Sequence, residues 1–105
     1  MSNEKESRFI SQKMGLKLKR IREELGLSQG GMLKQLGFSE EDGLFRSSIS
    51  GYELGTRIPP NNVILAYAKL ANISTDVLID DSLELSPEKI PYKKKNHGIK
   101  ISEVI

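Results

Sequence analysis

With 105 residues, 37% of them hydrophobic and 29% charged, the chain is long enough for one compact domain but too polar for a core that includes every residue. The absence of cysteine excludes a disulfide framework, thiolate metal sites and a cysteine nucleophile. Because no stretch is apolar for long enough to be a secretion signal or a membrane span, we expect a cytoplasmic protein. The net charge is only +2, so the distribution of the charges along the chain says more about binding partners than their sum does.

An amphipathic helix is predicted over 14–25, and one of its faces is basic. Its apolar side chains recur at spacings of four, three and four residues, up to the helix end at Gly26. They are Met14, Leu18, Ile21 and Leu25. The segment 13–22 contains no acidic residue but five basic ones, Lys13, Lys17, Lys19, Arg20 and Arg22. Such a cluster either binds a polyanion such as DNA or is an ordinary solvated helix face.

A second, shorter helix is predicted over Gln29–Leu36. Ser28 is a suitable N-cap because its hydroxyl can accept a hydrogen bond from the free amides of the first turn, and Gly37 ends the helix. The acidic stretch 38–43 then predicts a loop or a single turn capped by Ser39.

A third helix is predicted near 46–54, ending at Gly55. Within it, Ile49, Tyr52 and Glu53 share one face, and small polar residues occupy the other faces. Tyr52 is therefore expected in the core rather than as a stacking platform. The pattern predicts a short helix that is exposed on its polar side.

Two further helices complete the predicted domain. An apolar stripe after Pro60 predicts a helix that ends near Ala71, where Asn72 can take the left-handed conformation. Ser74 or Thr75 then caps a short fifth helix.

The chain is expected to divide into three parts. These are a flexible N-terminus at 1–10, a helical domain at 11–81 and a C-terminal tail at 82–105, in which prolines and a lysine run interrupt the helical pattern. Alternating apolar residues at 99–104 leave open a short strand that pairs with a partner or with the domain edge.

Two motifs identify a family resemblance. LGLSQ at 25–29 and ISGYELG at 49–55, with Pro59 behind it, resemble the phage-repressor or Cro-like helix-turn-helix family, also called the xenobiotic response element type. The resemblance extends over about 15–79. It implies an all-α, five-helix, lambda-repressor-like DNA-binding domain whose third helix enters the major groove while the second crosses the backbone.

The resemblance also implies which residues contact bases. Arg46, Ser47 and Gly51 match base-facing positions, and Ser50 matches a neighbouring polar one. Arg46 can donate two parallel hydrogen bonds to guanine O6 and N7, or it is simply a solvated arginine. The two serine hydroxyls carry little sequence information. Gly51 either lets the backbone approach DNA closely or only weakens the helix.

Phosphate contacts and a structural ion pair follow from the same resemblance. The phosphate-binding positions are Ser28, Gln29, Thr56 and Arg57, the first two at the amino end of the second helix. Arg22 and Glu53 match an ion pair between the first and third helices. Removing Glu53 is expected to harm folding as well as DNA binding, because the arginine is left without its partner.

One departure from the family pattern lies between Gly37 and Ile49, where this chain is longer than the family's compact turn. The insertion 39–42, which contains three acidic residues, either swings away from the DNA, weakens non-specific binding, or forms a loop that binds a partner.

These observations predict a sequence-specific, double-stranded DNA-binding transcriptional regulator that acts as a homodimer on a two-fold-related operator. The alternative is a protein-interaction or antitoxin-like adaptor that grips a protein partner with its C-terminal tail. We expect no enzyme, no cofactor and no metal site, because His97 has no second histidine or acidic pair at catalytic or metal-binding spacing.

Overall fold

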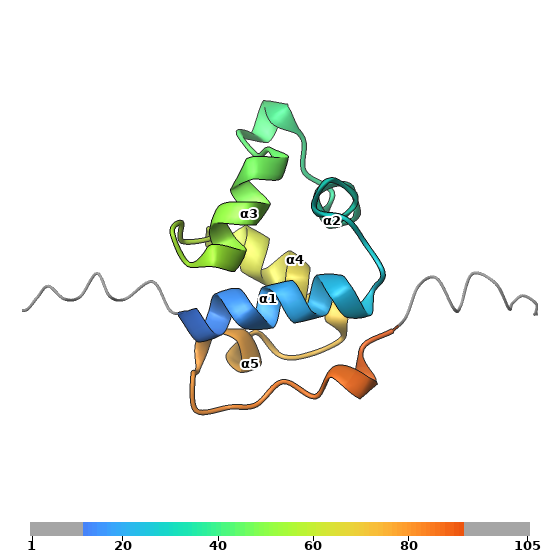
Figure 1. The fold of residues 1–105 in the computed structure, drawn as a ribbon, viewed down its shortest axis with the longest axis vertical. Coiled ribbons are helices and arrows are strands. Elements are labelled where there is room, and N and C mark those ends of the chain that lie inside the picture. Colours follow the sequence, from blue (N-terminus) through green and yellow to red (C-terminus); the bar gives the residue numbers. More distant parts are fainter. Residues whose placement is uncertain (1–11, 92–105) are drawn as a thin grey trace, which may run out of the picture.

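A computed structural model of the protein describes residues 12–91. The elements in this part are α1 (Gln12–Glu24), α2 (Gln29–Leu36), the 3-10 turn η2 (Glu40–Asp42), α3 (Arg46–Leu54), α4 (Asn61–Ala71), α5 (Thr75–Ile79) and the 3-10 turn η3 (Pro87–Lys89). The all-α class and the predicted helix order are confirmed (Figure 1). Several predictions concern residues outside this range. They are the flexible N-terminus at 1–10, the role of His97, the alternative strand at 99–104, and partner binding by the end of the C-terminal tail.

Local caps set the ends of the helices. The Ser28 hydroxyl accepts a hydrogen bond from the amide of the third residue of α2 at 2.9 Å. Gly37 and Asn72 end α2 and α4 in the left-handed conformation, with φ of 87° and 60°. Ser39 and Ser74 cap η2 and α5 through their side chains. These residue types stop or start a helix through bonds to their immediate neighbours, and this is why the boundaries were predictable.

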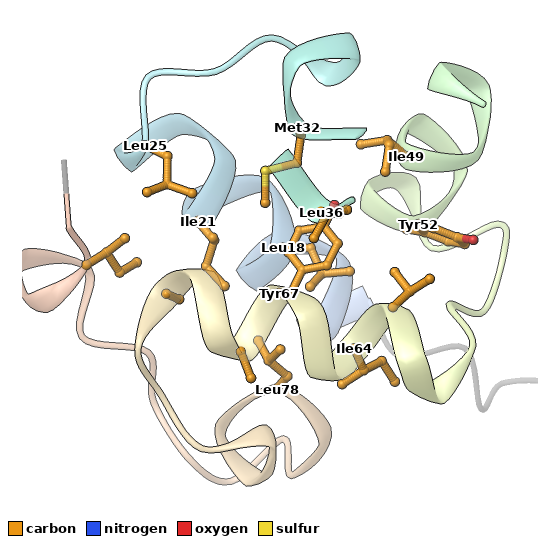
Figure 2. Packing of buried hydrophobic residues seen from close by; sticks show 14 of the residues in the cluster. Leu18, Ile21, Leu25, Met32, Leu36, Ile49, Tyr52, Ile64, Tyr67 and Leu78 are labelled. Atoms are coloured by element: carbon orange, nitrogen blue, oxygen red, sulfur yellow. The ribbon is translucent and has the colours of Figure 1, made fainter. Parts of the chain in front are cut away.

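Side chains from all five α-helices meet in one core, with Tyr67 of α4 near its centre (Figure 2). The largest fully buried apolar side chains are Leu18, Ile21, Leu25, Met32, Ile49, Val63, Tyr67 and Leu78. Fully burying a side chain of this size stabilises the fold by about 1.5–3 kcal/mol. The apolar stripe of α1 and the inner face of α3 therefore point to the same core, and this fixes which side of α3 is left for solvent.

Lys17 of α1 holds the end of α5 and the loop after it. Its ammonium group donates to the backbone oxygens of Val77 at 2.6 Å, Asp80 at 3.2 Å and Leu83 at 2.8 Å. A cation at a helix C-terminus binds carbonyl groups that have no partner within the helix. Lys17 is therefore a structural residue, although it lies in the basic cluster of the sequence.

The packed domain extends beyond the boundary expected after residue 81. Residues 82–91 run back past α1 rather than leaving the domain, and η3 contacts α1 (Figure 1). Ile90, directly after η3, is only 6% exposed and belongs to the core. The prolines that suggested a tail lie within this returning segment: Pro87 starts η3, and Pro91 follows the buried Ile90.

We expect Lys17→Met to lower the free energy of unfolding by about 1–2 kcal/mol, because methionine keeps the aliphatic stem but leaves three carbonyl groups without their charged donor. Urea denaturation monitored by circular dichroism measures the change. Lys19→Met, at an exposed position on the same helix, is the matched control and should stay within about 0.5 kcal/mol of wild type. Equal stability of the two variants would contradict the capping role of Lys17.

Tyr67 generates a second stability prediction. Its hydroxyl is buried and has no hydrogen-bond partner among residues 12–91, and burial raises the pKa of Tyr67, so the group stays protonated. A buried polar group without a partner costs about 1–3 kcal/mol. Tyr67→Phe keeps the ring and should leave the midpoint of thermal unfolding unchanged or higher. A decrease of more than about 1 kcal/mol in the free energy of unfolding would show that the Tyr67 hydroxyl has a hydrogen-bond partner.

Candidate nucleic-acid interface

α3 is buried on one side and open on the other. Ile49, Tyr52 and Glu53 face the interior and are buried. The outer face comprises Arg46, Ser47, Ser50 and Leu54, of which Ser50 is half-buried and the others are exposed. Positions 46, 50 and 54 are four residues apart and so form one stripe along the helix, with Ser47 beside it. The three expected base-contacting side chains thus lie on one surface.

The inner side of α3 is fixed by the ion pair that the family resemblance implied. Arg22 Nε donates to Glu53 Oε2 at 2.7 Å, and Arg22 Nη2 donates to Glu53 Oε1 at 3.1 Å. The side chains are 15% and 4% exposed. Hydrogen bonding to Glu53 raises the pKa of Arg22, so the guanidinium group stays charged. Two parallel bonds fix the direction of the pair as well as its distance.

α2 is tied to the same carboxylate. Gln29 Nε2 donates to Glu53 Oε1 at 3.2 Å, and Arg22 Nη1 donates to the backbone oxygen of Leu27 at 3.0 Å. The Glu53 side chain therefore connects α1, α2 and α3. Part of the donor capacity of Gln29, expected at a phosphate, is used inside the protein, and the Ser28 hydroxyl accepts the capping bond from the amide of Gly31.

Two hollows flank this network. The first, of about 420 Å³, lies between the amino ends of α2 and α3 and is lined by Arg22, Ser28, Gln29, Gly30 and Arg46. The second, of about 330 Å³, lies between α1 and α3 and is lined by Leu16, Lys19, Arg22, Gln29, Ser50, Glu53 and Leu54. Helix amino ends and arginine side chains make the first hollow suitable for an anion. Sequence reasoning missed Leu16 and Leu54, which are exposed leucines outside the apolar stripes.

The basic residues of α1 are used in different ways. Lys13 donates to the backbone oxygen of Asp81 at 3.4 Å, and Arg20 pairs with Glu24 at 2.8 Å. Lys17 and Arg22 hold the contacts described above. Lys19 is exposed and borders the hollow beside α3. Most of the basic cluster therefore serves the fold, and its members beside the candidate interface are Lys19 and the paired Arg22.

The loop after α3 folds back onto that helix. Arg57 Nη1 donates to Ser48 Oγ at 3.1 Å, and the same oxygen accepts from the backbone N–H of Phe45 at 3.1 Å. Gly51, expected to face bases, is buried, and a Cβ added there would lie 2.6 Å from Cδ of Arg57. Thr56 Oγ1 donates to the Gly51 oxygen at 3.4 Å. The side chain of Arg57 thus forms the outer surface near position 51.

Ser48 was absent from the expected site. It is 2% exposed and acts as a cap for the first turn of α3, where Phe45 provides no polar side chain. A polar side chain at the third position of a helix can reach back to the N–H of the N-cap residue, as one half of a capping box does, and is a local signal. The signal was available in the sequence but was hidden by the three consecutive polar residues 46–48.

The acidic insertion does not cover the outer face of α3. Its residues form η2, which lies beyond the amino end of α3 in Figure 1. Leu44 is buried and anchors the insertion to the core, whereas Glu40, Glu41 and Asp42 are exposed. Arg46 and Ser47 remain exposed next to it.

Two absences concern the described residues alone. No group of three histidine, cysteine or acidic side chains within 12–91 is arranged to hold a metal ion. None of the helices in the same range has the length and apolar character needed to cross a membrane.

Comparison with known families supports the resemblance carried by the two motifs. Residues 15–83 match the model of the family described as helix-turn-helix domain. Comparisons with curated proteins and with solved structures found no match. The matched segment includes α2 to α5 and all of the residues that surround the Glu53 carboxylate.

Glu53→Ala is expected to lower the free energy of unfolding by about 2–4 kcal/mol, since it leaves the largely buried Arg22 without its acidic partner and removes the acceptor of Gln29. Thermal and urea unfolding measure the effect. Glu41→Ala, which removes an exposed carboxylate from η2, is the control and should change stability by less than about 0.5 kcal/mol. Wild-type stability of Glu53→Ala would show that the ion pair does not hold α3.

Proposed function

Because the chain belongs to the helix-turn-helix domain family, we propose that it is a transcriptional regulator that binds double-stranded DNA in a sequence-specific way. The observation that carries this proposal is the two-sided character of α3. Its inner side is locked to α1 and α2 through Glu53, and its outer side leaves Arg46, Ser47 and Ser50 accessible. A rigid helix with an open polar face suits the major groove, which is wide enough for an α-helix.

In the proposed complex α3 enters the major groove and α2 crosses the backbone. Arg46, in the first turn of α3, donates two hydrogen bonds to guanine O6 and N7. Ser47 and Ser50 add hydroxyl contacts to bases or phosphates. Leu54, at the far end of the same face and 67% exposed, is placed for an apolar contact with a thymine methyl group.

Phosphates are proposed to bind beside α3. The amino end of α2, with Ser28 and the remaining donor of Gln29, borders the hollow that Arg46 also lines. Lys19 of α1, which lines the second hollow together with Gln29, and Thr56 of the loop after α3 are exposed as well. Contacts of this kind fix the register of the protein on the duplex and carry no sequence information.

A single module of this size reads few base pairs, so we propose a homodimer on an inverted repeat, located in the cytoplasm and without enzymatic activity. Linking two modules turns the second binding event into an intramolecular one and supplies affinity that one module lacks. Two-fold symmetry of the protein then matches two-fold symmetry of the operator.

Selection of bound duplexes from a random pool tests the proposal. We expect an inverted repeat whose half-sites are separated by about one helical turn, and an affinity that falls steeply with salt concentration. Recovery of no preferred sequence would contradict sequence-specific recognition.

Arg46→Ala should weaken the preference for one base pair in each half-site. The expected loss in binding free energy is about 1–3 kcal/mol per contact, and the salt dependence of the affinity should stay nearly the same. Titration of wild type and variant against the selected duplex and its single base-pair substitutions measures this. Lys69→Ala removes an exposed positive charge from α4 and is the control. If the two variants bind alike, Arg46 is a solvated residue and not a base contact.

A further inference from the structure

The side chain of Arg57 occupies the space above Gly51. A Cβ added at Gly51 would lie 2.6 Å from Cδ, 2.7 Å from Cγ and 3.2 Å from Cβ of Arg57. Contacts under 3.0 Å are not tolerated by real Cβ atoms. Any side chain at position 51 would therefore push Arg57 away, and the glycine is needed for Arg57 to lie along α3.

Arg57 is anchored at both ends. Its backbone N–H donates to the Gly51 oxygen at 3.2 Å, and the neighbouring N–H of Thr56 donates to the same oxygen at 3.0 Å. At the far end, Arg57 Nη1 donates to Ser48 Oγ at 3.1 Å, and Ser48 is only 2% exposed. The guanidinium group is thus held by a buried hydroxyl, although the residue as a whole is exposed.

The direction of this side chain decides what it can reach. It runs from the loop after α3 towards the amino-terminal half of the helix and ends at Ser48, the neighbour of Ser47 on the outer face. Residues in this half of a recognition helix are the ones that contact base edges. A guanidinium group has five N–H donors in one plane, so a single bond to Ser48 leaves the others for a ligand.

We infer that Arg57 is a specificity-determining residue that reads a guanine through its O6 and N7 atoms, from the place that a side chain at position 51 would otherwise fill. This inference rests on the proposed DNA binding, and it replaces the phosphate contact that the sequence suggested for Arg57. Arg46 and Arg57 then flank Ser47 on opposite sides, so α3 presents two planar donors to the groove. The bond to Ser48 also reduces the freedom that Arg57 loses on binding.

Four proteins test the inference: Arg57→Ala, Arg57→Lys, Gly51→Ala and the double variant Gly51→Ala/Arg57→Ala. Each full-length protein is titrated at several salt concentrations with the duplex selected by wild type and with every single base-pair substitution of one half-site. Circular dichroism and thermal unfolding show whether each protein is folded.

We expect Arg57→Ala to lose about 10-fold or more in discrimination at one guanine-containing base pair and to keep its preferences elsewhere. Arg57→Lys keeps the charge but not the paired donors, so it should lose the same preference with an unchanged salt dependence. Gly51→Ala should lose the preference at that same base pair, because the new methyl group displaces Arg57. The double variant should then be no worse than either single one.

Three results overturn the inference. A loss on Arg57→Ala that is uniform over all duplexes, with a salt slope reduced by about one, identifies a phosphate contact and leaves the proposed function intact. Wild-type discrimination in a folded Gly51→Ala protein shows that Arg57 does not need the space above position 51. A wild-type protein with no salt-dependent affinity for any duplex overturns the proposed function together with the inference.

Discussion

The structure depends on the carboxylate of Glu53, because it is where three helices meet. The carboxylate belongs to α3, accepts two bonds from Arg22 of α1 and accepts a third from Gln29 of α2. The backbones of α1 and α3 also approach closely, since a Cβ at Gly15 would lie 2.5 Å from the Glu53 backbone oxygen. A charge that is 4% exposed is stable only with its partners in place, so the pair selects one orientation of α3 out of those that apolar packing alone would allow.

This network also decides which polar groups remain for a ligand. Some of these groups already form hydrogen bonds inside the protein, namely those of Arg22, Ser28 and Gln29. The Ser48 hydroxyl accepts two more, from Phe45 and Arg57. Residues that look similar in the sequence therefore differ in what they can bind. The outer face of α3 is the part whose polar side chains are not needed to hold the helix, and recognition requires groups that are rigidly placed but free to bind.

The helices were predictable because their signals are local. Ser28, Gly37 and Asn72 act on their immediate neighbours, so their residue types alone set the ends of α2 and α4. The return of residues 82–90 was not predictable, since Lys17 binds carbonyl groups 60 to 66 positions away and no local pattern contains that contact. The burial of Gly51 was missed for a related reason: it depends on the conformation of a loop residue six positions further on.

Gly51 shapes the outer face of α3 although it carries no side chain. By its position along α3 Gly51 would face the bases, but without a side chain it cannot distinguish one base from another. Its effect on the surface is nevertheless large, since it admits Arg57 from the loop and lets Ser48 hold the guanidinium group. The groups exposed on this part of α3 are therefore determined together by Ser48 and Gly51 of the helix and by Arg57 of the loop after it. A substitution at any one of them changes what the other two present, so their contributions to binding cannot be independent.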